Sequence, residues 1–222
     1  MKKLVRIIPN LLIKDDYLVK GIEFKDHKYV GDVFNAVKIF SEKKVHEIQL
    51  LDISARKKNQ CIDLNLIKKI RTEIFVPLAV GGGISNLDQV SNLINEGVEK
   101  VIINSANFTN KNLLSDIANK FGSQSVVVSI DVKKVGNDYK IFSNNGEKLE
   151  NIDLIDFIKY VQNNGAGEII LTSIDNEGLK NGLNQNLYTY VEDYIEVPLV
   201  AGGGAGSIAD IKVFFDNCSF AA

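Results

Sequence analysis

Asp131 has the side chain and the setting in this sequence that best suit acid–base chemistry. It ends the apolar run Val126-Val127-Val128-Ser129-Ile130. Partial burial at the end of such a run raises the pKa of a carboxyl group toward neutrality, where it can exchange protons. A structural alternative stays open, in which Asp131 caps a helix or pairs with Lys133. Asp52 and Asp175 also follow apolar runs, and they either orient loops and substrate or serve only as loop acceptors.

Two glycine triplets are the second chemical feature. Gly81-Gly82-Gly83 and Gly202-Gly203-Gly204 each follow an apolar run and precede an amphipathic segment. Glycine has no side chain, so its backbone can approach an anion closely. The N–H groups at the start of the following helix can then point at that anion. Tight turns need glycine in any case, but two such turns on one rim favour a ligand with two phosphates. The expected phosphate-binding residues are Gly82, Gly83, Asn104 and Ser105 at one site and Gly178, Gly203 and Gly204 at the other.

The glycine triplets belong to an internal repeat. Residues 47–53 recur as 168–174 and residues 77–83 recur as 198–204, and both pairs have the same offset, since 168 − 47 = 121 and 198 − 77 = 121. One constant offset over two separate segments indicates a duplicated half-domain. Leu12 in the first half corresponds to Asp131 in the second, with 131 − 12 = 119. Only one half therefore carries a carboxylate at the end of its first strand.

Short apolar runs alternate with amphipathic segments, as in a parallel sheet built from strand–helix units. Strands are expected at 4–9, 47–53, 77–80, 100–103, 126–131, 168–173 and 198–201, with a partial eighth at about 218–222. Helices are expected near 32–43, 62–73, 86–96, 111–121, 153–164, 184–193 and 207–215, with Asn86, Asn110 and Ser207 as N-caps. Two longer excursions, 15–31 and 134–150, follow the first and fifth strands and are either lids or surface hairpins.

Eight strands from two four-strand halves close naturally into a (β/α)₈ TIM barrel, whereas a doubly wound sheet has no reason to repeat at half-length. We predict an α/β fold with one such domain over residues 1–222 and half-repeats at about 1–121 and 122–222. The sequence ends inside the expected eighth strand, so the C-terminal part of the last unit is expected to be missing.

Composition excludes several classes of protein. The net charge is −2, with 45% hydrophobic and 24% charged residues, which is ordinary for a soluble globular domain and gives no reason to expect a nucleic-acid partner. No apolar run reaches the ~20 residues that span a membrane, and no secretory signal is visible, so a cytoplasmic location is expected. Cys61, Cys218, His27 and His46 form no metal-type spacing. We expect neither a metal site nor a cofactor.

The ordered motifs resemble the HisF family, the cyclase subunit of imidazole glycerol phosphate synthase in histidine biosynthesis. The resemblance runs from about Arg6 to Ala222 and rests on motifs such as Val19-Lys20-Gly21, Val80-Gly81-Gly82-Gly83-Ile84, Ile103-Asn104-Ser105-Ala106 and Gly165-Ala166-Gly167-Glu168-Ile169. It implies a (β/α)₈ barrel that takes ammonia from a HisH-like glutaminase. In that family ammonia and a bisphosphorylated ribosyl intermediate become imidazole glycerol phosphate and an aminoimidazole carboxamide ribotide.

The resemblance also assigns roles to residues and exposes two departures. The family uses two aspartates as general acid and base; Asp131 matches the second, but Leu12 stands at the first and cannot transfer a proton. Lys20 or Asp52 is a candidate replacement. Glu177 stands where the family has a phosphate-contacting aspartate. Arg6, Glu47, Lys100 and Glu168 match a charged ring that gates ammonia; alternatively they form a salt-bridged plug in the barrel floor.

The resemblance implies a heterodimer with a HisH-like glutaminase and a phosphorylated small-molecule substrate. Residues Ile8 to Leu12 resemble a divergent branch encoded with surface-polysaccharide genes, so the first expectation is ammonia supply for amidation of a bacterial surface-polysaccharide sugar, with a third, sugar-modifying amidotransferase. The alternative is the cyclase subunit of imidazole glycerol phosphate synthase. A second alternative is a non-catalytic scaffold that binds phosphosugars or activates the glutaminase.

Overall fold

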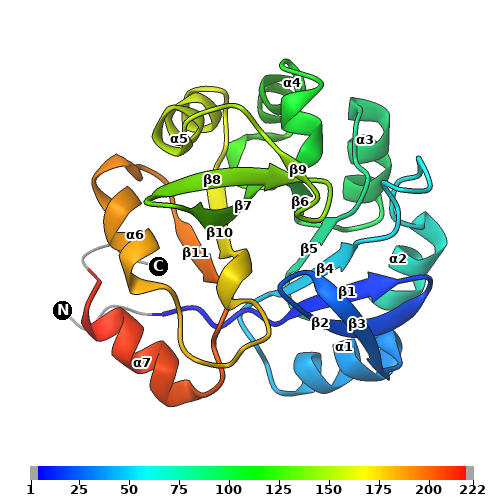
Figure 1. The fold of residues 1–222 in the computed structure, drawn as a ribbon. Helices are drawn as coiled ribbons and strands as arrows, with labels where there is room; N and C mark the ends of the chain where they lie inside the picture. The colour runs from blue at the N-terminus through cyan, green and yellow to red at the C-terminus, as the bar shows by residue number, and fades with distance from the viewer. Residues whose placement is uncertain (1–4, 219–222) are drawn as a thin grey trace.

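The computed structural model describes residues 5–218. Its centre is a strongly curled parallel sheet, and Figure 1 looks along the axis of the curl, with the helices outside the strands. The parallel strands follow the order β11-β10-β7-β6-β5-β4-β1. Their bounds are β1 Asn10–Lys14, β4 Ile48–Asp52, β5 Leu78–Gly81, β6 Lys100–Ile103, β7 Val126–Val135, β10 Glu168–Ser173 and β11 Leu199–Gly202. Within residues 5–218 the curl is open between β11 and β1, so it is an unclosed form of the predicted barrel.

Helices on the outer side connect the strands. Their bounds are α1 Val33–Glu42, α2 Leu64–Arg71, α3 Leu87–Asn95, α4 Leu113–Phe121, α5 Leu154–Asn163, α6 Gln185–Val191 and α7 Ile208–Asp216. Most begin at a side chain that accepts a backbone N–H of the first turn, which satisfies a donor that has no partner inside the helix. Asn86 caps α3 in this way, and Ser207 caps α7 as part of a capping box with Asp210. Both predicted caps are confirmed.

Alternation along the strands divides the apolar residues between two cores. Ile48 and Leu50 of β4 belong to the large core between sheet and helices. The intervening side chains point inward, where a small cluster of Ala79, Ile102, Val127 and Ile170 fills the middle of the curl, with Leu51 and Val200 packed against it. The last described strand, β11, is fixed by Tyr188 of α6, whose hydroxyl lies 2.6 Å from the Leu171 carbonyl and accepts from the Gly202 amide at 2.9 Å.

Both predicted excursions are antiparallel hairpins. β2 (Tyr17–Ile22) and β3 (Lys25–Gly31) follow β1, while β8 (Asp138–Ser143) and β9 (Lys148–Leu149) follow β7. The turn of the first hairpin reaches the loop after β10, because the Glu23 amide donates to the Glu177 carbonyl at 2.9 Å. Each hairpin thus extends the rim at the carboxyl ends of the parallel strands.

Two predictions of local structure are wrong. The first strand begins at Asn10 and not in the 4–9 run, whose last residue, Pro9, has no N–H to donate to a sheet; its carbonyl nevertheless accepts from the Gln49 amide. The N-cap of α4 is Asn112, and the Asn110 side chain accepts from the Asn112 amide instead. The predicted eighth strand lies, apart from Cys218, outside the described residues.

Candidate active site and charged ring

Asp131 lies on β7 at the rim of the curl and is 7% exposed. Its Oδ2 accepts a hydrogen bond from Nδ2 of Asn104, which directly follows β6, at 2.7 Å. Burial raises the pKa of Asp131 to about 7, the charge of Glu177 adds to the rise, and the Asn104 hydrogen bond opposes it. Lys133, a possible ion-pair partner, instead places its Nζ 5.4 Å from the ring centre of Phe142. The site therefore holds a carboxyl group that can both accept and release a proton near neutral pH.

The equivalent place on β1 has no acid. Leu12 pairs in register with Leu51 of β4, which packs against the inner cluster, and lies between the buried outward-facing Leu11 and Ile13. Strand alternation therefore turns Leu12 inward. An aliphatic side chain at this position supplies no proton.

The first hairpin and the loop after β10 are brought together on the rim. Gly178 has φ +77°, and a Cβ placed on it would lie 2.3 Å from the Gly21 carbonyl oxygen, so only glycine allows this approach. Burial raises the pKa of Glu177, and the charge of Lys20 opposes that rise. Two predicted site residues from distant segments, Lys20 and Glu177, thus interact electrostatically.

The two glycine triplets make equivalent turns. Gly83 has φ +63° and Gly204 has φ +101°, and added Cβ atoms would lie 1.8 Å from the Gln60 carbonyl oxygen and 2.2 Å from the Gly182 carbonyl oxygen. In both places the triplet packs directly against the loop that follows the preceding parallel strand, β4 or β10. Gly82 and Gly203 also have positive φ, at +130° and +91°. Close packing therefore explains the glycines, and phosphate binding by these turns remains a prediction.

Ser105 connects the first predicted phosphate site to the second hairpin. Its Oγ accepts from the Asn144 amide at 3.1 Å and lies 3.4 Å from Asn104 Oδ1. Asn104 contacts Asp131 at its other end. A ligand bound at Ser105 would therefore lie next to Asn104, the residue whose side chain contacts Asp131.

Two other aspartates act as loop acceptors. Asp52 Oδ1 accepts from the amides of Ser54 and Ala55 at 2.8 and 3.0 Å. Asp175 Oδ2 accepts from the Lys134 amide at 2.8 Å. Both residues lie where the sequence predicted them, at the end of β4 and just after β10. Their hydrogen bonds are those of structural loop acceptors, the alternative to a role in orienting substrate.

A basic pocket on the same rim was missed from the sequence. It has a volume of about 370 Å³, and among its lining residues are Lys14, Lys25, His27, Lys57 and Lys58. Glu147 and Asp15 also line it and pair with Lys57 and Lys58, so the cations outnumber the carboxylates. Burial lowers the pKa of His27, and the charges of Lys14 and Lys57 add to the effect. The pair Lys57-Lys58 is visible in the sequence, but the other members come from β1 and the first hairpin and meet only in the fold.

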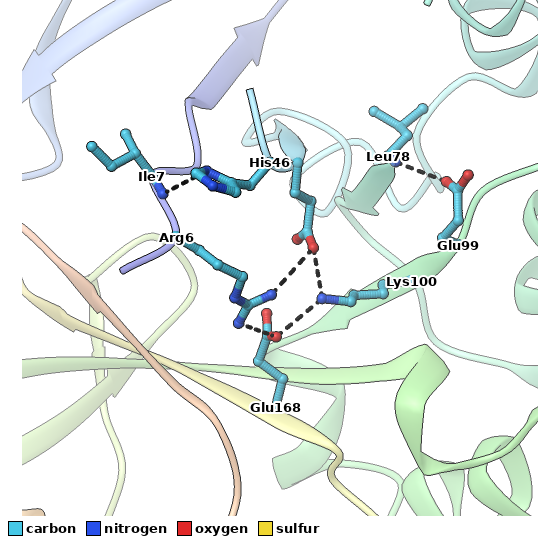
Figure 2. A network of polar contacts seen from close by, with 8 residues as sticks. Arg6, Ile7, His46, Leu78, Glu99, Lys100 and Glu168 are labelled. Carbon is cyan, nitrogen blue, oxygen red and sulfur yellow. Dashed lines mark hydrogen bonds and ion pairs between the residues drawn. The ribbon is translucent and has the colours of Figure 1, made fainter. Parts of the chain in front are cut away.

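A ring of four charges occupies the opposite end of the curl (Figure 2). Lys100 Nζ lies 2.6 Å from Glu47 Oε2 and 3.0 Å from Glu168 Oε2, and Arg6 lies 3.7 and 2.7 Å from the same two atoms. The two glutamates are 3% and 4% exposed. The structure thus brings together all four residues of the predicted gate.

Three buried polar atoms near this ring have no hydrogen-bond partner in the described structure. They are Glu47 Oε1, Glu168 Oε1 and Gln49 Nε2. Buried polar groups are normally paired, so each such atom needs an explanation. Gln49 stands out in the sequence as a polar residue within an apolar strand, but the sequence does not predict that its amide lacks a hydrogen-bond partner.

Within residues 5–218 no group of three or more side chains is arranged to hold a metal ion. Cys61 has a free thiol, and the Cys218 sulfur accepts a hydrogen bond from Gln185 Nε2 at 3.2 Å. The described helices include none that is long and apolar enough to cross a membrane.

Comparison with known proteins extends over nearly the whole chain. The family model described as "Histidine biosynthesis protein" matches residues 6–222. A putative imidazole glycerol phosphate synthase subunit hisF3 from Vibrio vulnificus is 43% identical over 208 residues, 93% of this chain and 80% of the relative. A putative subunit hisF2 from Pseudomonas aeruginosa is 43% identical over 218 residues, 98% of this chain and 87% of the relative. An imidazole glycerol phosphate synthase subunit HisF from Natranaerobius thermophilus is 40% identical over 210 residues, 95% of this chain and 84% of the relative. With this coverage and identity, the chain belongs to the HisF family of histidine-biosynthesis proteins.

Proposed function

We propose that this protein is a HisF-type cyclase subunit that receives ammonia at the charged ring and uses it on a phosphorylated substrate at the opposite rim. The observation that carries the proposal is the pairing of two sites on one sheet. Asp131, with a pKa of about 7, lies at one end of the inner face, and the Arg6, Glu47, Lys100 and Glu168 ring lies at the other.

The reaction that the relatives' names support is that of imidazole glycerol phosphate synthase. Ammonia and the bisphosphorylated ribosyl intermediate would become imidazole glycerol phosphate and the aminoimidazole carboxamide ribotide. Asp131 would exchange protons with the substrate, and Asn104 would orient its carboxylate. The glycine turns at Gly82–Gly83 and Gly203–Gly204 would hold the two phosphates.

One observation favours a second candidate function. Leu12 leaves the β1 end of the rim without the second acid of that reaction, and a general acid or base contributes about 10²–10⁴ in rate. A subunit with the ring and Asp131 but no acid on β1 would suit ammonia delivery to another acceptor. The acceptor proposed is a bacterial surface-polysaccharide sugar, modified with the help of a separate amidotransferase.

Both functions require a glutaminase of the HisH type beneath the ring. Two segments that precede parallel strands on this side carry exposed apolar side chains to which a glutaminase would bind. Phe75, ahead of β5, is 94% exposed, and Ile7, ahead of β1, is 44% exposed. The Phe75 amide donates to Ser41 Oγ at 3.0 Å, so its backbone is held while its ring faces outward. Such rings are typical centres of protein interfaces.

The test is ammonia-dependent turnover of the bisphosphorylated ribosyl intermediate by the unaltered protein, beside Leu12→Asp and Asp131→Asn variants. Turnover by the unaltered protein that Asp131→Asn abolishes would establish the cyclase. Turnover that appears only in Leu12→Asp would show that proton transfer was the missing element and would favour the second function.

A third result would contradict both functions. If no variant turns over the intermediate or transfers ammonia to a sugar, while the protein still stimulates the glutaminase, the protein acts as an activating scaffold. Asp131→Asn separates the cases further, because loss of stimulation with ligand binding intact argues against a scaffold.

A further inference from the structure

Gln49 is the side chain in the interior whose chemistry the proposed function leaves unused. It lies on β4, is 2% exposed, and its Nε2 has no hydrogen-bond partner in the described structure. Its chain neighbours Ile48 and Leu50 belong to the outer core, so alternation turns Gln49 into the curl. A buried polar amide thus points into the curl.

The position of Gln49 connects the charged ring to the interior. Glu47 lies two residues earlier on the same face. In register, Gln49 pairs with Ala79, and Ala79 pairs with Lys100, whose Nζ contacts both ring glutamates. The small Ala79 side chain lies between the two longer ones. Gln49 therefore lies beside the ring, on the path toward the inner cluster.

The unpaired atoms define what would bind there. Glu47 Oε1 and Glu168 Oε1 need hydrogen-bond donors, whereas Gln49 Nε2 needs an acceptor. Neutral ammonia has three N–H donors and one lone pair, so it offers the donors and the acceptor that these three atoms need. An ammonium ion has no lone pair to accept from Nε2. The ring charges already balance as two cations and two carboxylates, so the site offers no net charge to hold a cation.

We propose that Gln49 is a positioning residue that holds neutral ammonia just inside the ring, with the free carboxylate oxygens of Glu47 and Glu168 as its other partners. This inference rests on the proposed ammonia-using function. The Gln49 amide selects the unprotonated form, which is the form that can enter the apolar cluster without a large desolvation cost and act as a nucleophile. Ammonia is bound by hydrogen bonds alone, with no covalent step.

Binding is tested on the isolated protein by following the side-chain amide signals of Gln49 by NMR during titration with ammonium chloride. The signal is assigned by its loss in a Gln49→Met variant. A saturable shift is expected at alkaline pH, where ammonia is present, and no shift is expected at acidic pH or with sodium chloride. The exposed Gln124 provides the control signal. A Gln49 signal that does not respond, as for a site filled only by water, would overturn the proposal.

Transfer is tested in the complex with the glutaminase. Gln49→Met should lower glutamine-dependent turnover about fivefold to tenfold, the change expected for one lost hydrogen bond, and should leave turnover with saturating external ammonia less affected. An equal fall in both activities would contradict positioning.

The two tests fail separately. A saturable NMR shift in a protein that uses no ammonia would keep the binding site and refute the proposed function. A missing shift in a protein that does use ammonia would refute the site alone.

Discussion

Asn104 donates a hydrogen bond of 2.7 Å from its side chain to Asp131 and so links the end of β6 to β7. The bond favours the charged carboxylate, while burial favours the neutral acid, and the pKa of Asp131 settles at about 7. An Asn104→Leu variant keeps the size of the side chain and removes the donor. We expect the pKa of Asp131 to rise by a further unit, roughly, as for a hydrogen bond to a charged group.

The pH dependence of turnover, or of the Asp131 carboxyl signal in NMR, measures this shift. Asn110→Leu, an exposed change in the loop before α4, is the control. An unchanged pH profile in Asn104→Leu would show that the hydrogen bond does not tune the acid.

Replacement of Asp131 by asparagine should change how stability depends on pH. The pKa of Asp131 is about 7 in the folded protein, against 3.8 for an unperturbed aspartate. Between these values the folded state keeps a proton that the unfolded state releases, so the free energy of unfolding falls as the pH rises through this window. Asp131→Asn removes this contribution, which is on the order of a few kcal/mol at neutral pH.

Urea unfolding at a series of pH values tests the prediction. The variant should be more stable than the parent near neutrality and should show a flatter profile between pH 3.8 and about 7. Parallel profiles for the two proteins would place the ionisation of Asp131 near its ordinary range.

Removal of one cation from the ring should be costly. In Lys100→Met the two glutamates keep only Arg6, so a largely buried carboxylate loses its closest partner. Breaking a buried ion pair by removing one side typically costs about 3–5 kcal/mol. Lys57→Met is the matched control, because the Lys57–Glu147 pair is exposed on both sides and should contribute less than about 1 kcal/mol. Thermal unfolding measures the stability of both variants. Equal losses of stability in Lys100→Met and Lys57→Met would show that burial does not make the ring ion pairs more important than an exposed pair.

Gly83 and Gly136 offer a matched test of the close packing at the first glycine triplet. Their φ angles are +63° and +64°, but a Cβ on Gly83 would lie 1.8 Å from the Gln60 carbonyl oxygen, whereas one on Gly136 has nothing within 4 Å. Gly136→Ala should cost about 1–2 kcal/mol for the left-handed backbone alone. Gly83→Ala should lower the free energy of unfolding by about 2 kcal/mol or more beyond the effect of Gly136→Ala. Urea unfolding measures both changes. Similar costs would show that the loop moves away freely.

The exposed Phe75 ring should determine binding of the glutaminase. A Phe75→Ser variant should raise the dissociation constant of the complex about tenfold or more, as for the loss of a central aromatic contact. The free energy of unfolding of the isolated protein should not change. Ile208→Ser is the control, because Ile208 is 78% exposed at the start of α7, after β11, on the opposite rim. Calorimetric titration with the HisH-type partner measures both. If only the control weakens binding, the partner binds the other end.

Elements with local signals could be predicted from the sequence. Helices lie within two residues of their expected bounds because caps such as Asn86 and Ser207 mark their starts. The first strand was misplaced because the apolar run before Pro9 has the composition of a strand but lacks its pairing. β7 runs four residues past its expected end, to Val135, because it continues into the second hairpin.

Contacts between distant segments could not be predicted in the same way. Burial of Asp131 followed from the apolar run before it, but its bond to Asn104 depends on how β6 and β7 pair. The basic pocket joins Lys14 to Lys57 through the curl of the sheet. The unpaired Gln49 amide depends on which side chains fill the interior, and sequence periodicity alone does not specify that.

Glu47 and Glu168 are equivalent residues of the two half-repeats, 121 positions apart, and both contact the one ammonium group of Lys100. Each half-repeat thus places one carboxylate at the same end of the curl, and the two carboxylates share one cation. At the rim that equivalence is lost, since the counterpart of Asp131 is an aliphatic residue. The two half-repeats thus share an acidic residue at one end of the sheet and differ at the other end, where only one half carries an acid.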